Sequence, residues 1–241
     1  LPTVAATVLA LDPQTGMPLA LMEGDSLTAL RTGAAGGVAA RYLARADAGT
    51  VALFGAGVQA RAQLLAAMAV RKIERVWIVD PFESAAQRLA ADISGWTDAP
   101  AVTLAHSPRS AVAQADIVLA ATTTTAPLFD GNDLKPGAHV TGVGSFTPQM
   151  QEIDANTIRR ARVVVDQRDA AMAEAGDIII GEAVIDAEIG EIINGDQPGR
   201  RNDEEITFFK SVGLAVQDAV TAAAVLKAAE KIGLGTVILM S

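Results

Sequence analysis

The amino-acid sequence predicts an α/β protein whose central element is a doubly wound parallel β-sheet. Short apolar runs alternate with helical patterns between residues 50 and 165. The runs are apolar at successive positions, as strands are when helices cover both faces of a sheet, and this alternation is typical of parallel sheets. Half of the 241 residues are hydrophobic, yet no run approaches the roughly 20 residues that span a membrane. We therefore expect a large buried core and no membrane association.

Two elements precede this alternation. Apolar runs at 3–12 and 17–22 flank a turn at 13–16 that contains Pro and Gly, so a β-hairpin is expected. An Ala-rich helix is expected over 27–45, because the pattern is helical and a glycine follows it closely.

The alternating elements then follow in chain order. The expected strands are 51–54, 75–79, 102–104, 117–121, 139–143 and 163–165, and the expected helices are 61–70, 84–93 and 110–114. A long Ala-rich helix over 212–232 and a short strand over 236–240 close the chain. Since the hairpin and the last helix lie outside the repeat, we assign 1–30 and 214–241 to a smaller α+β domain built from both chain ends, and 31–213 to the main domain.

Charge and composition exclude several classes of protein. The formal net charge is −9, and the 19 Lys and Arg residues are scattered, so no nucleic-acid partner is expected. Cysteine is absent, and the two histidines, His106 and His139, lack metal-site spacing, which argues against thiolate chemistry and a metal. The chain starts at Leu1 in mid-pattern without a secretory signal. We expect a cytoplasmic protein that lacks its beginning.

A glycine-rich turn follows the strand at 51–54. It reads Gly55-Ala-Gly57-Val-Gln-Ala60 and leads directly into a helix. The first glycine permits a tight turn, the second lets the backbone approach a pyrophosphate, and the small third residue allows close packing of helix against strand. The pattern indicates a dinucleotide site, although a glycine-rich turn without a ligand has the same letters.

An acidic residue ends the next expected strand. Asp80 lies 23 positions after Gly57, where a carboxylate accepts hydrogen bonds from an adenosine ribose and repels a 2′-phosphate. NAD(H) is therefore favoured over NADP(H). The alternatives are that Asp80 only caps a helix, or that the turn binds S-adenosylmethionine, which the small Ala60 disfavours.

Two further strand ends carry polar or small residues. The threonine run Thr122 to Thr125 follows the strand at 117–121, and Val143, Gly144 and Ser145 close the strand at 139–143. Ligand contacts of a parallel sheet lie just past such ends. We expect Thr122 and Thr123 to contact ribose or phosphate oxygens, or to cap a turn, and Gly144 to let the backbone approach a nicotinamide.

Taken together, these residues resemble the ornithine cyclodeaminase/μ-crystallin family. The resemblance spans the chain and is carried by LTALRTGAAGG at 27–37, FGAGVQA at 54–60, VGSFTP at 143–148 and DEEITFFKSVGLAVQD at 203–218. It implies a Rossmann-type domain that binds NAD(P), a smaller dimerisation and substrate domain, and a homodimer. It also implies chemistry at the Cα–N bond of a small amino or imino acid.

The resemblance assigns roles to individual residues. Arg31 matches the arginine that binds the substrate carboxylate; alternatively it is solvated or pairs with Glu23 or Asp25. Lys210 either reaches the substrate or is exposed or structural. Val58, Gln59 and Asp80 match cofactor contacts, and Thr123 lies beside a cofactor-contacting Thr. Ser211 and Val212 match residues near the nicotinamide and the substrate. Other charged residues are interpreted as helix caps: Glu152 and Asp154 at a helix start, and Asp203 and Glu204 before the final helix.

Two departures from the family pattern narrow the expected activity. An N-terminal segment with a substrate-binding Arg and Lys is not in this sequence, and Phe146 stands where cyclodeaminases carry an Asp. That Asp handles the amino group during ring closure, so Phe146 favours a cyclic imine (Δ1-pyrroline-2-carboxylate or ketimine) reductase. The alternatives are an ornithine cyclodeaminase or alanine dehydrogenase of the same family, or a non-catalytic small-molecule binding protein of the μ-crystallin kind.

Overall fold

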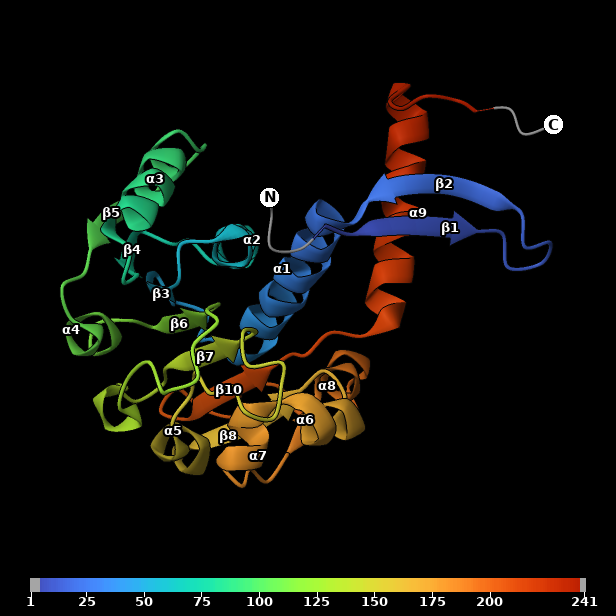
Figure 1. Ribbon diagram of the computed structural model, residues 1–241. Coiled ribbons are helices and arrows are strands. Elements are labelled where there is room, and N and C mark those ends of the chain that lie inside the picture. The colour runs from blue at the N-terminus through green and yellow to red at the C-terminus, as the bar shows by residue number, and fades with distance from the viewer. Residues whose placement is uncertain (1–4, 239–241) are drawn as a thin grey trace. The chain divides into compact units, whose positions relative to one another are not determined.

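The computed structural model describes residues 5–238 (Figure 1). The chain forms two compact units. The smaller unit combines the residues up to Arg31 with those from Gly213 onward, and the larger unit consists of Thr32–Val212. The first division falls within helix α1 (Gly24–Leu43). No helix among the described residues combines the length and the apolar character needed to cross a membrane.

The larger unit contains an eight-stranded parallel sheet with the order β5-β4-β3-β6-β7-β10-β8-β9. The strands are β3 (Thr50–Phe54), β4 (Arg75–Val79), β5 (Ala101–Leu104), β6 (Ile117–Ala120), β7 (His139–Gly142), β8 (Ala161–Val165), β9 (Ala187–Glu188) and β10 (Ile206–Lys210). Every neighbouring pair is parallel. The predicted α/β fold with a parallel sheet is confirmed.

Helices cover both faces of this sheet (Figure 1). Besides α1 they are α2 (Val58–Val70), α3 (Glu83–Ser94), α4 (Pro108–Val112), α5 (Ala155–Arg160), α6 (Arg168–Glu174), α7 (Gly176–Ile180) and α8 (Ile189–Asn194), with a 3-10 turn, η1 (Gly131–Asp133). Alternate residues of β3 serve the two faces: Leu53 packs in one cluster with α2 and α3, and Phe54 in another with α4 to α7. This double coverage explains why the strands are apolar at successive positions.

Strand β10 is the central strand that the sequence pattern misses, and the short edge strand β9 and helices α6 to α8 are also absent from the expected elements. Strand β10 is the last strand along the chain but lies between β7 and β8, and all five of its residues are buried. As a result, the final helix α9 (Ala215–Ile232) begins three residues later than expected. Asp203 and Glu204 precede β10 and not a helix, so their interpretation as caps of the final helix is wrong.

The smaller unit consists of a hairpin and α9. Strands β1 (Thr7–Leu11) and β2 (Pro18–Glu23) pair antiparallel, with an irregularity between Ala10 and Leu11. Asp12 stabilises the turn, since its carboxylate accepts the backbone N–H groups of Gln14 and Thr15. The expected hairpin is confirmed within the described residues. Its first two expected residues, 3 and 4, lie outside them. Of the expected strand at 236–240, residues 236–238 are not in a strand, and the rest lies outside the described residues.

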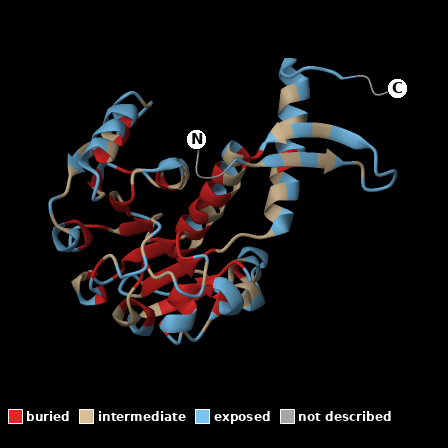
Figure 2. Cartoon of the chain, in the orientation of Figure 1, coloured by how far each residue is buried: buried red, intermediate tan, exposed pale blue. Residues whose placement is uncertain are grey.

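Burial differs sharply between the two units. The strands of the parallel sheet are mostly buried, whereas the hairpin and α9 are half-buried or exposed except at Ala222 (Figure 2). On the hairpin, Leu9 and Leu21 are cross-strand partners, and they are 55% and 71% exposed. One face of the hairpin therefore carries exposed leucines, and no other described part of this unit covers this apolar surface.

Candidate functional site

The candidate site lies at the carboxyl ends of the parallel strands of the larger unit. From β3 the chain builds the sheet through β4 to β5, and then returns to the other side of β3 with β6. A parallel sheet opens a crevice at such a reversal, and ligands of doubly wound folds bind there. Since all these strands are parallel, the segments that follow β3, β4, β6, β7, β8 and β10 emerge at the same edge.

The glycine turn occupies this reversal point. Gly55 has φ +92°, and a Cβ at this residue would lie 2.6 Å from the Ala121 carbonyl oxygen after β6. Gly57 precedes α2 with ordinary extended angles, and a Cβ built on it meets nothing within 4 Å. Thus Gly55 is required by the fold, whereas the space beside Gly57 is open to a ligand.

Helix α2 presents its amino end at this turn. Gly57 is its N-cap residue and provides no side-chain cap. The first backbone N–H groups of a helix lack intrahelical acceptors and favour an anion. Val58 is exposed and Gln59 is half-buried. The turn and the helix end together form a cradle of the kind that binds a pyrophosphate.

Asp80 links the end of β4 to the glycine turn. Its Oδ2 accepts the backbone N–H of Ala56 at 2.8 Å, and its Oδ1 accepts that of Phe82 at 2.8 Å. The side chain is half-buried. A carboxylate has about four lone-pair sites, so two backbone bonds leave capacity for ribose hydroxyls while they fix the orientation of the group.

The segments after β6 and β7 are joined by Glu152. Its Oε1 accepts the backbone N–H of Thr122 at 2.6 Å and the Thr122 hydroxyl at 2.8 Å, while its Oε2 accepts the N–H of Gly144 at 2.7 Å. Thr123 beside it is exposed, and Val143 is half-buried. The interpretation of Glu152 as a helix-start carboxylate is therefore wrong. Only Asp154 caps α5, where it accepts the N–H of Thr157.

A buried ion pair lies next to Glu152. Lys210 and Asp177 have no exposed surface, and their Nζ and Oδ2 atoms are 3.3 Å apart without hydrogen-bond alignment. Asp177 Oδ1 accepts the backbone N–H groups of Glu152 and Ile153. Lys210, for which the sequence left substrate contact, exposure or a structural role open, is thus enclosed in the core of the larger unit, so the exposed alternative is wrong.

Ser211 and Val212, which follow β10, are fixed by Asp166. Its Oδ2 accepts the Ser211 hydroxyl at 2.8 Å and the Val212 N–H at 3.0 Å. Ser145, after β7, is also buried, and its hydroxyl accepts the N–H of Asp177. These hydrogen bonds hold the predicted contact residues in defined positions.

Sequence reasoning did not identify Asp166 or Asp177, yet each had a signal. Asp166 directly follows an apolar strand, as Asp80 does, and the same argument applied to both would have selected it. Asp177 precedes three isoleucines, and all three residues at 176–178 are buried. A single acid among apolar residues indicates a buried and paired carboxylate.

In the smaller unit, Arg31 is held by residues of α9. Its Nε lies 3.2 Å from Asp218 Oδ1, and its Nη1 lies 3.5 Å from Gln217 Oε1. Gly213 has φ +88°, and a Cβ there would overlap the guanidinium. The guanidinium is therefore oriented on one side by an acid and accommodated on another by a glycine.

The suggested pairing of Arg31 with Glu23 or Asp25 does not occur. Glu23 accepts the backbone N–H groups of Asp25 and Ser26 at the start of α1, and Asp25 accepts the N–H of Ala6. Both carboxylates stabilise the junction between β2 and α1, and the partner of Arg31 comes from α9 instead.

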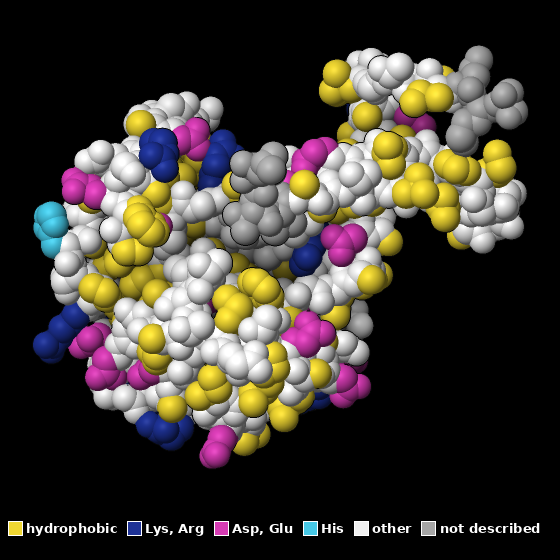
Figure 3. Space-filling model, viewed as in Figure 1, with side chains coloured by type: hydrophobic (Ala, Val, Ile, Leu, Met, Phe, Trp, Pro, Cys, Tyr) yellow, Lys and Arg dark blue, Asp and Glu magenta, His cyan; other side chains and the backbone are white. Residues whose placement is uncertain are grey.

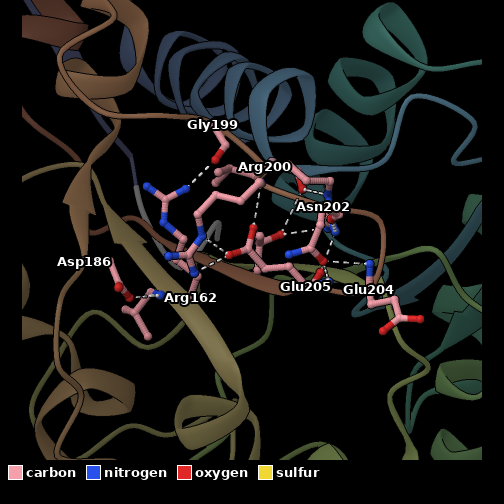
Figure 4. Close-up of polar contacts among 11 residues, drawn as sticks. Arg162, Asp186, Gly199, Arg200, Asn202, Glu204 and Glu205 are labelled. Atoms are coloured by element: carbon pink, nitrogen blue, oxygen red, sulfur yellow. Dashed lines mark hydrogen bonds and ion pairs between the residues drawn. The ribbon is translucent and has the colours of Figure 1, made fainter.

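The opposite edge of the larger unit is closed by a polar network (Figure 4). At the amino ends of β7, β8 and β10, Arg162 donates to the Gly199 carbonyl and Arg200 to the Leu43 carbonyl. His139 is hydrogen-bonded to Thr207 and Thr141, and burial lowers its pKa to about 3. A histidine that stays neutral at this edge has a structural role.

Among residues 5–238, no three His, Cys, Asp or Glu side chains come together as a cation site.

The fold and the glycine turn at the carboxyl ends of the strands define a Rossmann-type α/β protein. Comparison with known proteins identifies the family. A model of the ornithine cyclodeaminase/mu-crystallin family matches residues 1–232. The chain is also 43% identical to Delta(1)-pyrroline-2-carboxylate reductase of Bacillus cereus over 241 residues, which is 97% of this chain and 74% of that protein. The chain belongs to the ornithine cyclodeaminase/mu-crystallin family.

Two solved structures are similar over nearly the whole chain. Delta(1)-pyrroline-2-carboxylate reductase of Thermococcus litoralis, in complex with NADH and L-proline, matches with a TM-score of 0.95 and 42% identity, covering 99% of this chain and 76% of the other. An archaeal alanine dehydrogenase dimer with bound NAD matches with a TM-score of 0.92 and 34% identity, covering 100% and 76%.

Proposed function

We propose that this chain is a nicotinamide-dependent oxidoreductase that reduces a small cyclic imine carboxylate, such as Δ1-pyrroline-2-carboxylate, to the corresponding cyclic amino acid. The observation that carries the proposal is the 42% identity and 0.95 TM-score to a reductase in complex with NADH and L-proline. The open glycine turn at the sheet's reversal point supports it, because its geometry suits a dinucleotide.

The residues of the larger unit fit the cofactor. The space beside Gly57 and the amino end of α2 suit a pyrophosphate, and Asp80 is placed beside the glycine turn with free acceptor capacity. A negative carboxylate at this position favours ribose hydroxyls over a 2′-phosphate, so we infer a preference for NAD(H) over NADP(H). A bound nicotinamide supplies the hydride that the imine carbon accepts.

Arg31 is proposed to bind the substrate carboxylate. Its Nε is engaged by Asp218 and its Nη1 by Gln217, which orient the guanidinium, and the remaining N–H groups of the two terminal nitrogens are donors suited to a carboxylate. Fixing the carboxylate limits the imine to few orientations, which lowers the entropic part of the barrier. A protonated imine accepts hydride readily, so the chemistry requires few acid or base groups.

Substrate panels with the purified protein test this function. The reductase predicts NADH oxidation with Δ1-pyrroline-2-carboxylate alone. Oxidation that requires pyruvate plus ammonia would instead identify an alanine dehydrogenase, the activity of the second similar structure. Ammonia release from ornithine without net NADH consumption would identify a cyclodeaminase, and ligand binding without any turnover would identify a binding protein.

We infer that the protein forms a homodimer through its smaller unit. The outer hairpin face exposes Leu9, Leu11, Leu19 and Leu21, and Figure 3 shows hydrophobic side chains at the surface of this unit. The similar alanine dehydrogenase is a dimer.

The double substitution Leu19→Lys with Leu21→Lys should shift the mass measured by light scattering from dimer to monomer. Val184→Lys, at an 82% exposed position of the larger unit, should leave the mass unchanged, and an unaltered mass in both variants would contradict the assignment.

A further inference from the structure

We propose that Glu152 is a positioning residue for the cofactor: it fixes the segments after β6 and β7 to one another, and the buried Asp177–Lys210 ion pair holds it in place. This inference rests on the proposed function, because it concerns how the same edge of the sheet is kept in a binding conformation. Neither the resemblance nor the sequence pattern assigned Glu152 such a role.

The contacts of Glu152 span two segments that are far apart in the chain. One oxygen accepts both the N–H and the hydroxyl of Thr122, and the other accepts the N–H of Gly144. The segments themselves touch, since a Cβ on Gly144 would overlap the Thr122 carbonyl oxygen. One carboxylate therefore sets the distance between the ends of two neighbouring strands.

The position of Glu152 is itself fixed through the backbone. Asp177 Oδ1 accepts the N–H groups of Glu152 and Ile153 at 2.7 and 2.9 Å, and Asp177 Oδ2 faces Lys210 Nζ. Glu152, Asp177 and Lys210 have no exposed surface. Burying two carboxylates and one ammonium is costly unless hydrogen bonds and opposite charge compensate. Here hydrogen bonds compensate the two carboxylates, and the Lys210 ammonium is compensated by the Asp177 charge alone.

The surroundings raise the pKa of the Glu152 carboxyl group: burial is the main cause and the Asp177 charge adds to it, while the Lys210 charge and the Thr122 hydrogen bonds oppose the shift. All three groups that contact its oxygens act as donors, which is an arrangement that an acceptor-only carboxylate satisfies completely. An amide in its place would direct an N–H at another N–H and release one of the two segments.

The larger unit contains a natural control with the same chemistry at its other edge. Asp116 accepts the backbone N–H groups of Gly49 and Thr50 and the Thr50 hydroxyl, and it pairs with Lys135 at 2.6 Å. It thus also joins two strand ends with a Lys partner, but at the amino ends of β3 and β6. If Glu152 had only a structural role, its substitution and the substitution of Asp116 should have the same effect on NADH affinity.

The test compares Glu152→Gln with Asp116→Asn in the full chain. We measure the NADH dissociation constant by fluorescence titration, the melting temperature, and kcat and KM with Δ1-pyrroline-2-carboxylate. Both variants should lose thermal stability. Only Glu152→Gln should also weaken NADH binding, by about ten-fold or more, because it releases a segment at the cofactor edge. Equal NADH affinity in the two variants would overturn the proposal.

A milder variant covers the case in which Glu152→Gln does not fold. Thr122→Val removes the hydroxyl contact to Glu152, together with the 3.4 Å hydrogen bond that this hydroxyl accepts from the Thr124 N–H, and keeps the backbone bond to Glu152, so it should weaken NADH binding by a smaller factor. An unchanged NADH affinity in Thr122→Val would count against the proposal. The binding measurement is independent of turnover: if the unaltered protein binds NADH but does not reduce the imine, the proposed function fails and the role of Glu152 is still decided by the titration.

Discussion

Replacing Gly57 with alanine should separate cofactor binding from stability. A Cβ at this position meets nothing within 4 Å, and φ is −91° with ψ −171°, angles that alanine adopts readily. Alanine restricts the unfolded chain and so stabilises by about 0.4–1 kcal/mol, whereas it is a poorer N-cap than glycine by a similar amount. These two effects nearly cancel, and the melting temperature should shift by no more than about 3 °C.

NADH binding should respond very differently. If the pyrophosphate of the cofactor packs against the protein backbone at Gly57, the new methyl group displaces the pyrophosphate. At least one hydrogen bond between a phosphate oxygen and a backbone N–H is then lost. Such a charge-assisted bond contributes about 1.5–3 kcal/mol, which corresponds to about a 10- to 150-fold weaker Kd. Fluorescence titration with NADH and a thermal melt of the same sample give both quantities.

Gly55→Ala provides the contrasting control. Its φ of +92° and the 2.6 Å approach to the Ala121 carbonyl predict a large loss of stability even without cofactor. Wild-type NADH affinity in Gly57→Ala would refute the argument that the second glycine of the turn faces the pyrophosphate.

Three further substitutions test other parts of the structure. Asp80→Ser should raise the activity ratio of NADPH to NADH, and an unchanged ratio would contradict the ribose assignment. Arg31→Met should raise KM for the imine by about 10- to 100-fold and leave the NADH dissociation constant unchanged; normal KM would exclude Arg31 as the carboxylate-binding residue. His139 is neutral in the folded state, with its pKa lowered from 6.5 to about 3, so stability should fall as pH decreases from about 6.5 towards 3, where the unfolded state takes up a proton that the folded state does not. His139→Asn should flatten that part of the stability profile, and an equally steep profile in the variant would assign the loss to other groups.

The sequence predicts elements well where local pattern decides them. The strand over 75–79 and the strand at 51–54 were identified because each is apolar throughout and is followed by a turn or an acid. Strand β10 was missed although its residues Ile206–Lys210 are mostly β-branched or aromatic, as is typical of strands. It is short, and its neighbours β7 and β8 are distant in the chain, so its place inside the sheet does not follow from local pattern.

The buried polar groups show the same limit. Glu152 and Asp154 are two residues apart and have the same local context, but one joins two strand ends and the other caps α5. The partner of Arg31 is likewise 187 residues away, at Asp218. Contacts of this kind depend on which segments the fold brings together, so the residue types alone do not determine them.

The insertion of β10 between β7 and β8 also affects the order in which the larger unit is completed during synthesis. Strands β5, β4, β3, β6 and β7 form one contiguous part of the sheet and are all translated by residue 142. Strand β8 has no neighbour on its β7 side until residues 206–210 leave the ribosome, so β7 and β8 present unpaired edges meanwhile. Unpaired edges are prone to aggregation. Nascent chains released before residue 206 should therefore depend on chaperones far more than chains released after residue 210.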